Sequence, residues 1–473
     1  MSLVVGVDSS TSACKVEVRH LDTGRIVATG RAPHPTTTPP RSEQAPSAWW
    51  SAFEHACRTA GVSANGPQAP AAIAIGAQQH GMVASAHDGS VLRPAKLWND
   101  TESASDADAL VAALGGPQAW AEACGSVPVA AFTITKLHWL RRNEPDLFAR
   151  LGSVLLPHDW LTGQLTGRRT TDRGDASGTG WWSPAEGHYR LDLLALVDDT
   201  VDWAPLLPEV LGPREQAGSW GDGTTVVAPG TGDNMAAALG LGLRPGDMVL
   251  SLGTSGTAFC VSAQPSADPT GTVAGFADAT GHFLPLVCTL NATKVTDAVA
   301  RLLGVSAPEL DALALAAPAG AGGLVLVPHL DGERTPNRPE ATGTLTGMRS
   351  DVTREQLARA AVEGVVCNLI AGADELARWS PGIRDGRVFL IGGGAHSTAY
   401  RQIAADLLGR PVTIPHTEEL VACGAAVQAA VAFSGATFDD IGAAWNLGAG
   451  TTVEPSQGAD GAAVRAAYAA AAS

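Results

Sequence analysis

Short apolar runs that end in polar or glycine-rich segments recur along the chain and predict the strands of an α/β protein. Residues 71–76 and 387–391 are two such runs, and each is typical of a buried strand. Helical periodicity follows elsewhere. Residues 353–356 have the spacing of a capping box, and the apolar residues after them recur at helical intervals. Further helices are expected from about residue 235 to 241 and from about 398 to 408.

Two segments about half a chain apart repeat one pattern of strand, small-residue turn and strand. In residues 4–18 the turn spans 8–13, and in residues 248–261 it spans 253–256. Duplication of one domain is the simplest account of this repeat. A chain of 473 residues is also too long for one ordinary core, so it is expected to form more than one domain.

The repeated turns are rich in Gly, Ser and Thr, so their N–H groups and hydroxyls can point at one anion. Either turn alone reads equally as an ordinary hairpin. The repetition favours phosphate binding, because two facing copies would clamp one phosphate chain. The residues expected to contact phosphate are Thr11, Ser12, Gly253, Thr254, Ser255 and Gly256.

Charge and cysteine content narrow the function classes. The formal net charge of -16 argues against a nucleic-acid partner or an anionic membrane, which rely on basic surfaces. An anionic ligand would therefore need backbone N–H groups, helix N-termini or a divalent cation. Seven cysteines without a C-x-x-C pair indicate reduced thiols and a cytoplasmic location. No signal segment and no apolar run long enough to span a membrane is evident.

The familiar motifs of other phosphate and hydrolytic enzymes do not occur. The sequence contains no G-x-x-x-x-G-K-[ST], D-F-G or H-R-D motif, and no G-x-S-x-G or H-E-x-x-H motif. P-loop, protein-kinase, serine-hydrolase and zincin chemistry therefore have no local support.

Polar residues gather where two predicted strands end, which is where ligands bind in open α/β sheets. Gln79 and His80 follow the first strand, and an amide beside an imidazole suits sugar hydroxyls. A satisfied structural histidine is the alternative. Trp98 would form an apolar wall against a sugar face with Asn99 beside it, or else a packed tryptophan followed by an Asx turn. Residues 170–179 predict a polar loop to which we assign no function.

Asp233 is the strongest candidate for a catalytic group. It precedes a predicted helix, so the simplest interpretation is an N-cap. However, it also lies 20 residues before the second glycine turn, beside the presumed domain junction. A carboxylate there suits a general base for a hydroxyl nucleophile.

The strand at 387–391 runs into a glycine-rich segment and then a helix. Gly393, Gly394 and Ser397 in this segment would form a nucleotide pocket, or else a permissive strand-to-helix turn.

Taken in order, these motifs resemble those of the FGGY carbohydrate kinases, and among them most of all the kinases of xylulose. The resemblance covers nearly the whole chain. Its motifs are 8–15, 42–44 with 49–50, 79–81, 98–100, 132–137, 156–159, 232–234, 252–256, 330–336 and 391–395.

The resemblance implies two actin-like, ribonuclease-H-like domains related by duplication, with a catalytic cleft between them. Residues 1–243 would bind sugar and carry the catalytic aspartate, and residues 244–473 would bind ATP. It also implies a homodimer, and no nucleic-acid or membrane partner is expected.

The resemblance further implies a role for each matching residue. Gln79 and His80 would contact the ketose, Asn234 would orient it, and Asp233 would accept the proton. Asp8 would lie near Mg2+ and the γ-phosphate, directly or through water. Residues 253–256 would hold phosphates, and Gly393 with Gly394 would flank the nucleoside.

Three positions depart from the family pattern. Ser10 and Ala13 replace the two glycines of the first turn, and a side chain at a position of positive φ costs about 1 kcal/mol, so a reshaped hairpin is expected. Glu102 stands where the family often has an arginine, so no cationic contact with substrate is assigned there.

The activity implied is ATP-dependent, Mg2+-assisted phosphorylation of D-xylulose to D-xylulose 5-phosphate, with Asp233 as the base. The alternatives are a kinase for another sugar or polyol, such as ribulose, gluconate or glycerol, and a non-catalytic actin-like ATP-binding protein.

Overall fold

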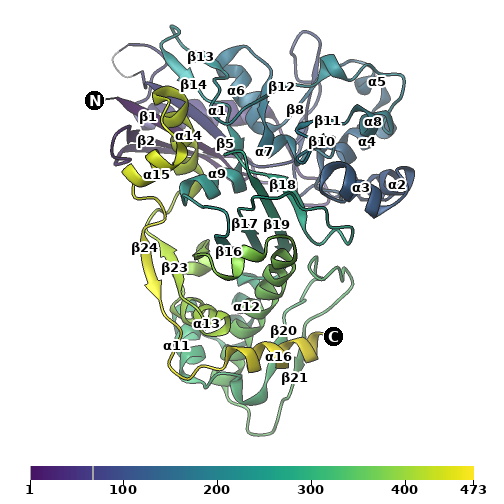
Figure 1. Ribbon diagram of the computed structural model, residues 1–473. Coiled ribbons are helices and arrows are strands. Elements are labelled where there is room, and N and C mark those ends of the chain that lie inside the picture. The colour runs from purple at the N-terminus through teal and green to yellow at the C-terminus, as the bar shows by residue number, and fades with distance from the viewer. Residues whose placement is uncertain (1, 67–68) are drawn as a thin grey trace. The chain divides into compact units, whose positions relative to one another are not determined.

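The computed structural model describes residues 2–66 and 69–473, which form two compact units (Figure 1). Each unit combines helices with a central sheet, which confirms the predicted α/β class. Unit 1 consists of Met1–Leu243, Pro265–Leu284 and Thr417–Gly448, and unit 2 consists of Arg244–Gln264, Pro285–His416 and Ala449–Ser473.

A seven-stranded sheet organises unit 1, with strand order β13-β14-β5-β1-β2-β3 and with β15 also paired to β5. Strands β1, β2 and β3 are antiparallel, whereas β1, β5 and β14 run parallel. The strands of this sheet are β1 (Leu3–Ser9), β2 (Ala13–His20), β3 (Ile26–Pro33), β5 (Ala72–Ala77), β13 (Gly218–Trp220), β14 (Thr225–Val227) and β15 (Thr231–Gly232).

Short strands and helices complete unit 1. The strands are β4 (Glu43–Gln44), β6 (Val83–Ala86), β7 (Ala95–Lys96), β8 (Leu151–Leu155), β9 (Thr170–Asp172), β10 (Trp182–Ser183), β11 (His188–Tyr189), β12 (Glu209–Leu211) and β18 (Ala274–Ala277). The helices are α1 (Pro46–Thr59), α2 (Ala104–Ala113), α3 (Pro117–Cys124), α4 (Thr133–Asn143), α5 (Pro145–Phe148), α6 (Pro157–Thr166), α7 (Arg173–Ala176), α8 (Leu191–Ala195), α9 (Asp233–Gly240), α14 (Leu420–Ser434) and α15 (Phe438–Ala444).

The second seven-stranded sheet, in the order β18-β19-β17-β16-β22-β23-β24, supplies the strands at the centre of unit 2. Its strands beyond β18 are β16 (Met248–Leu252), β17 (Gly256–Cys260), β19 (Phe283–Thr289), β22 (Val388–Ile391), β23 (Val412–Pro415) and β24 (Gly450–Val453). The remaining elements are β20 (Val325–Val327), β21 (Thr344–Thr346), α10 (Thr293–Leu303), α11 (Ala307–Ala316), α12 (Arg354–Trp379), α13 (Thr398–Leu408) and α16 (Gly461–Ala472).

The two sheets share one topology, as the repeat predicts. The path β3-β2-β1-β5-β14 in unit 1 corresponds to β19-β17-β16-β22-β23 in unit 2. In both paths the first three strands are antiparallel and the last three are parallel. The repeated turns are the hairpins between β1 and β2 and between β16 and β17.

Strand β5 lies between the two strands that carry candidate catalytic residues. Asp8 on β1 pairs with Gly76, and Thr231 on β15 pairs with the same glycine from the other side. Because all three strands are parallel, their carboxyl ends meet at one edge of the sheet. This pairing brings Asp8, residues 78–80 and Asp233 to one place in unit 1.

The predicted helices form, with one difference at a boundary. Helix α13 has the expected bounds, and Thr353 caps α12 in a capping box with Gln356. Helix α9 begins at Asp233, two residues earlier than expected, with the extended residue Gly232 as its N-cap. Asp233 is therefore the first helical residue, and the N-cap interpretation of its position is wrong.

Helix α14 packs against α9 and β1 through backbone contacts that only glycine allows (Figure 1). A Cβ added to Gly424 would lie 1.8 Å from the carbonyl oxygen of Ala236, and one added to Gly6 would lie 1.8 Å from that of Ala422. These distances are far below van der Waals contact. The helix that carries Asp233 is thus held against the helix that covers β1.

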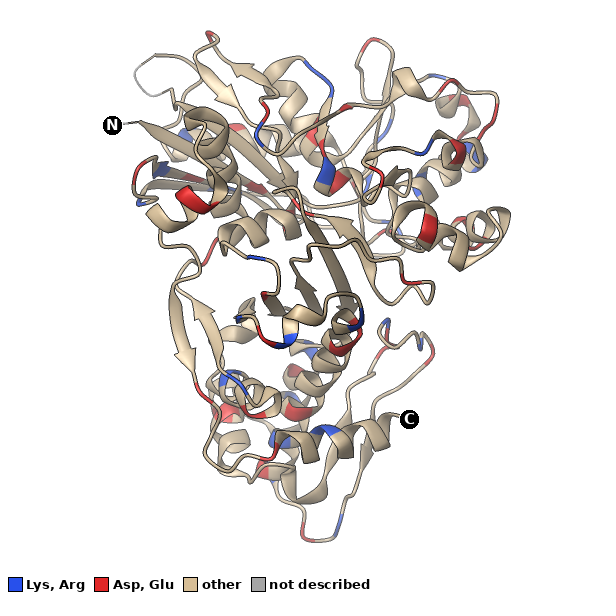
Figure 2. Cartoon of the chain, viewed as in Figure 1, with Lys and Arg blue, Asp and Glu red and all other residues tan. Residues whose placement is uncertain are grey.

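Acidic and basic residues are interspersed over both units (Figure 2). Among the described residues, no single helix is long and apolar enough to cross a membrane. The bent pair α14 and α15 meets that test by length and composition only, and α14 is mostly buried in unit 1.

We predict opposite effects for the same substitution at two helical glycines. Gly424→Ala would force α14 away from α9, so the free energy of unfolding should fall by about 1–3 kcal/mol. A Cβ added at Gly442 on α15 meets only the side chain of Leu447, at 3.9 Å. Gly442→Ala should therefore raise the free energy of unfolding by up to about 1 kcal/mol, because alanine has the higher helix propensity. Urea unfolding of both variants tests this, and equal effects at the two sites would contradict the packing argument.

Candidate active site

Asp8 stands at the end of β1 with one oxygen engaged and one unpartnered. Its Oδ2 lies 3.3 Å from Lys15 Nζ, and Lys15 also donates to Glu419 at 2.6 Å. Oδ1 is buried and has no hydrogen-bond partner among the described residues. Burial raises the pKa of Asp8 to about 6, although Lys15 acts in the opposite direction. An unpartnered buried carboxylate oxygen at a strand end is available to a cationic ligand.

The first hairpin turn closes without the strain expected from its lost glycines. Neither Ser10 nor Ala13 has a positive φ, so the cost expected for a side chain in the left-handed region does not arise. Ser10 donates to the carbonyl oxygen of Ala13 from both its N–H and its hydroxyl, each at 3.0 Å. Side chains fit here because the backbone does not enter the left-handed region.

Thr11 links the turn to its surroundings, and Ser12 beside it is exposed. The Thr11 hydroxyl donates to Gln78 Oε1 at 3.2 Å and accepts from Trp98 Nε1 at 2.9 Å. The partly exposed Trp98 therefore lies beside the turn. Asn99 is half-buried, and its Oδ1 has no partner among the described residues.

His80 follows β5 in a strained conformation. Its φ of 64° is in the left-handed region, which is uncommon for a residue with a Cβ. Its ring stacks on Phe132 with centroids 5.1 Å apart, and Nδ1 lies 2.9 Å from the carbonyl oxygen of Gly178. These contacts hold a partly exposed imidazole in a fixed orientation.

A chain of hydrogen bonds joins Gln79 to Asp233. Asn234 Nδ2 donates to Gln79 Oε1 at 2.8 Å and to Asp233 Oδ1 at 3.0 Å. The backbone N–H of Asn234 also donates to Asp233 Oδ1, at 2.8 Å. Burial raises the pKa of Asp233 to about 7, with smaller contributions from the negative charges of Asp8 and Asp175. A carboxyl group with this pKa can accept a proton near neutral pH.

The second hairpin turn lies next to the glycine-rich segment of unit 2. Gly253 accepts from the N–H of Thr293 at 2.9 Å, which ties the turn to the start of α10. A Cβ on Gly394 would lie 2.7 Å from Leu252 and 3.0 Å from Thr293, so this glycine permits close packing. Thr254 and Ser255 are exposed, and Gly256 is buried against Thr289.

A pocket of about 500 Å³ opens beside this segment, within the range of small-molecule sites. Gly393, Gly394 and Ser397 line it, together with residues of α10, α11 and α13. The Ser397 hydroxyl caps α13 and donates to Asp311 Oδ1 at 2.7 Å. The structure thus brings Gly393, Gly394 and Ser397 to one pocket, and residues 253–256 of the predicted phosphate turn are not among the residues that line it.

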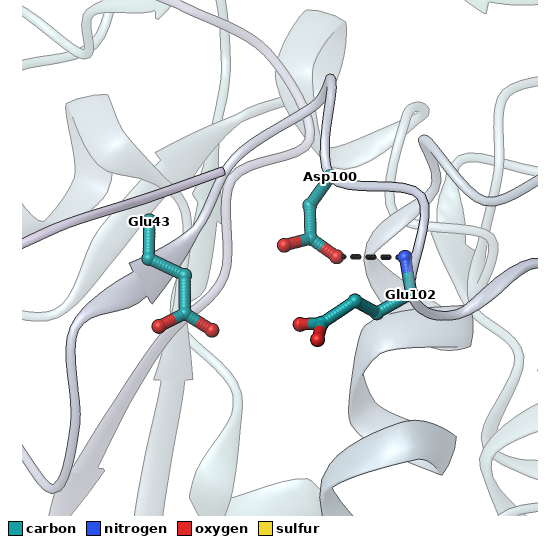
Figure 3. Close-up of side chains that lie close together, drawn as sticks. All are labelled: Glu43, Asp100 and Glu102. Atoms are coloured by element: carbon teal, nitrogen blue, oxygen red, sulfur yellow. Dashed lines mark hydrogen bonds between the residues drawn. The ribbon is translucent and has the colours of Figure 1, made fainter. Parts of the chain in front are cut away.

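Three carboxylates in unit 1 point toward one another: Glu43, Asp100 and Glu102 (Figure 3). Lys96 Nζ lies 3.0 Å from Glu43 and 3.2 Å from Asp100, forms an ion pair with Glu102, and sits 3.9 Å from the ring centroid of Trp139. A buried ammonium therefore takes the place that a metal ion would need.

Sequence reasoning missed a buried ionic cluster in unit 1. Its members are His158, Asp159, Asp172 and Asp175, all almost fully buried. His158 Nδ1 lies 2.7 Å from Asp175, and its Nε2 lies 3.1 Å from Asp159. Two of these aspartates belong to the stretch expected to be a loop without a function. The helical turn α7 contains only four residues, too few for periodicity to reveal it.

A second missed residue is Glu333 in unit 2. It is 1% exposed and accepts hydrogen bonds from the N–H groups of Leu290 and Arg334 and from the side chains of Asn291 and Asn368. Four donors on one buried carboxylate give it a role in holding the loop after β19. Its motif was visible in the sequence, but its role was not.

Comparisons with known proteins identify the family of the chain. The models of the N-terminal and C-terminal domains of the FGGY family of carbohydrate kinases match residues 3–240 and 248–433. A xylulose kinase of Streptomyces coelicolor is 48% identical over 459 residues, which cover 96% of this chain and 92% of that protein. One of Streptomyces rubiginosus is 47% identical with the same coverage. The crystal structure of a xylulose kinase from Bifidobacterium adolescentis superposes with a TM-score of 0.87 at 42% identity, over 100% of this chain and 99% of that one.

We predict that the Lys96 ammonium can be replaced in part by a metal ion. Lys96→Met leaves three carboxylates without their shared cation and should lower the free energy of unfolding by about 3–5 kcal/mol. Added Ca2+ should then raise the melting temperature of the variant but not of the wild type. Arg41→Met, which removes an exposed partner of Glu102, should do neither. A variant as stable as the wild type would contradict the role of Lys96.

Proposed function

Because the chain belongs to the FGGY family of carbohydrate kinases, and so is a carbohydrate kinase, we propose that it phosphorylates D-xylulose to D-xylulose 5-phosphate with ATP. The support for this substrate is the name shared by its relatives at 47–48% identity. The observation that carries the proposed mechanism is the Gln79–Asn234–Asp233 hydrogen-bond chain at the end of β5.

Asp233 is the proposed general base. Its Oδ1 is occupied by the two N–H groups of Asn234, whereas no hydrogen bond is made to Oδ2 within the described residues. Oδ2 would accept the proton of the primary hydroxyl as the hydroxyl oxygen bonds to the γ-phosphorus and ADP leaves. A pKa of about 7 leaves about half of the carboxyl groups ionised at neutral pH, and the ionised form is basic enough to take that proton.

Gln79 and His80 are the proposed sugar contacts. They lie at a strand end, and the strained backbone of His80 presents its ring from a fixed position. Asn234, which already contacts both Gln79 and Asp233, would orient the hydroxyl toward the base. Trp98 and Asn99 are assigned to the sugar side of the site as well, although Trp98 bonds to Thr11 of the phosphate turn.

ATP is the proposed phosphoryl donor, bound in unit 2 at the pocket beside Gly393 and Gly394. Exposed Thr254 and Ser255 on the turn would contact phosphate oxygens, as would Thr11 and Ser12 on the turn of unit 1. The charge on the nucleotide is offset without a lysine-rich surface, because turn N–H groups supply part of the positive potential.

Magnesium fits the residues around Asp8. The buried Oδ1 has no partner among the described residues, and a carboxylate oxygen is a ligand that Mg2+ accepts directly or through water. When bound, Mg2+ would offset the negative charge that develops on the transferred phosphoryl group. Lys15 holds the other oxygen of Asp8 and so fixes the direction of Oδ1.

We predict that Asp233→Asn lowers kcat by about 10²–10⁴-fold, because the amide keeps the shape of the side chain but cannot accept the proton. KM for the sugar should change little. The measurement is steady-state ADP release with D-xylulose, D-ribulose, gluconate and glycerol, with products identified by NMR. Asp222→Asn, on an exposed turn, is the control. Near-normal turnover in a folded Asp233→Asn variant would contradict the assignment of Asp233 as the base. A preference of the wild type for another acceptor would contradict D-xylulose as the substrate.

We predict that Gly393→Val weakens nucleotide binding selectively. A Cβ at Gly393 meets no atom within 4 Å and the residue has no positive φ, so the fold should tolerate valine. The side chain would project into the pocket, and KM for ATP should rise at least about tenfold, which corresponds to 1.4 kcal/mol. KM for the sugar and the melting temperature should stay unchanged. An unaltered KM for ATP would place the nucleotide elsewhere.

A further inference from the structure

The three residues before Asp233 are Gly230, Thr231 and Gly232. They contact the buried cluster of His158, Asp172 and Asp175. Gln428 on α14 holds Gly230 by bonds to its N–H, at 2.9 Å, and to its carbonyl oxygen, at 3.1 Å. The Thr231 hydroxyl donates to Asp172 Oδ2 at 2.7 Å.

The two glycines are required because cluster side chains occupy the space of a Cβ. A Cβ on Gly230 would lie 2.7 Å from His158 Cδ2. One on Gly232 would lie 2.6 Å from Gln79 Cγ and 3.1 Å from Asp175 Oδ1. Gln79 and Asp175 therefore flank the residue immediately before Asp233.

Asp175 and Gln79 each retain one unsatisfied atom of complementary type. Asp175 Oδ2 is taken by His158 Nδ1 at 2.7 Å, but Oδ1 has no hydrogen-bond partner among the described residues. Gln79 Oε1 is taken by Asn234, but its donor Nε2 also lacks a partner there. Both atoms are buried, and leaving either one without a hydrogen bond costs free energy. A direct bond or one bridging water would satisfy a donor and an acceptor at once.

His158 opposes the effect of burial on the ionisation of Asp175. Burial alone would lower the pKa of His158, but Asp159, Asp175 and Asp172 together raise it to about 9. Burial raises the pKa of Asp175, and the contact with His158 opposes that effect. The imidazolium thus keeps a carboxylate fully buried beside Gln79.

We propose that Asp175, paired with His158, is a positioning residue that fixes the amide of Gln79 and, through Gln79 and Asn234, the carboxylate of Asp233. The inference rests on the proposed function, because it assigns Asp233 as the base. It gives a purpose to His158 and Asp175, to which no direct contact with the sugar is assigned.

The test compares Asp175→Asn and Asp175→Ala with a matched control, Asp106→Asn. Asp106 in unit 1 is equally buried, and its Oδ1 also lies 2.7 Å from a histidine Nδ1, that of His138, but no contact joins it to Gln79. Removal of Asp175 should lower kcat roughly 10- to 100-fold, because small displacements of a catalytic group have effects of this size. KM for ATP should change less than about threefold, whereas KM for the sugar should rise, because Gln79 is a proposed sugar contact. Asp106→Asn should lower only the melting temperature.

The pH profile separates positioning from loss of folded protein. The base must be ionised, so kcat/KM of the wild type should fall as the pH drops below about 7. Asp8 and Asp175 are the charged groups that raise the pKa of Asp233, and Asn234 lowers it. Without the carboxylate at 175, the pKa of Asp233 should fall, and the acid limb should move to lower pH. A purely structural role would leave the limb in place.

A crystal structure of Asp175→Ala provides a readout that does not depend on activity. The Gln79 amide should turn, and its 2.8 Å bond with Asn234 should be lost. If the bond persists, or if kcat and the acid limb match the wild type, the inference is overturned. Asp233→Asn measured in parallel distinguishes failure of the base assignment from failure of the role proposed for Asp175. Full activity in that variant overturns the base assignment, whereas an inactive Asp233→Asn beside an unaffected Asp175→Asn overturns only the role of Asp175.

Discussion

The pairing of three parallel strands at Gly76 is the constraint on which the candidate active site of unit 1 depends. Asp8 and Thr231 pair with this residue from opposite sides. Gln79 follows Gly76 by three residues in the chain, and Asp233 follows Thr231 by two. Strand β5 is buried throughout, and on one face the small residues Ala72, Ala74 and Gly76 let α14 pack closely against it. A register shift of one residue would move every side chain on β15 to the other face of the sheet. It would also break the link from Gln79 through Asn234 to Asp233.

Packing of small residues behind the sheet enforces that register. A Cβ at Gly76 would lie 2.9 Å from Val421 on α14 and 3.1 Å from Ala236 on α9. Gly424 and Gly6 bring the same helix into backbone contact with α9 and β1. The abundance of glycine and alanine is therefore a requirement of the site, because the elements that carry Asp8 and Asp233 approach one another only where side chains are absent.

The sequence allowed prediction of what local pattern encodes, and not of what tertiary contacts impose. Both hairpins, the helix at 398–408 and the gathering of Gln79 and His80 at a strand end follow from apolar runs, turn residues and caps. The roles of His158 and Asp175 do not, because polar residues in a short irregular stretch give the same signal whether they are solvated or buried together. The strain expected at Ser10 and Ala13 does not arise, because it assumed a positive φ at both residues and the backbone enters that region at neither.

Buried cations recur where this acidic chain must hold several carboxylates close together. Lys96 forms ion pairs with Glu43, Asp100 and Glu102, and Lys15 forms ion pairs with Asp8 and Glu419. His158 forms ion pairs with the aspartates around Gly230. The three differ in one respect that bears on chemistry. The carboxylates around Lys96 all have hydrogen-bond partners, whereas beside Lys15 and His158 one oxygen each of Asp8, Asp159 and Asp175 has none among the described residues.

Two of these aspartates, Asp8 and Asp175, also raise the pKa of Asp233, in addition to the larger effect of burial. A carboxylate that is hydrogen-bonded by two N–H groups at a helix start would ordinarily be a weak base, because both the bonds and the helix dipole favour its ionised form. Burial beside two further negative charges opposes that preference. The basicity of Asp233 is thus set by a balance between its own helix, which lowers the pKa, and neighbours on β1 and α7, which raise it. The cations that hold those neighbours in place therefore act indirectly on Asp233, the proposed base.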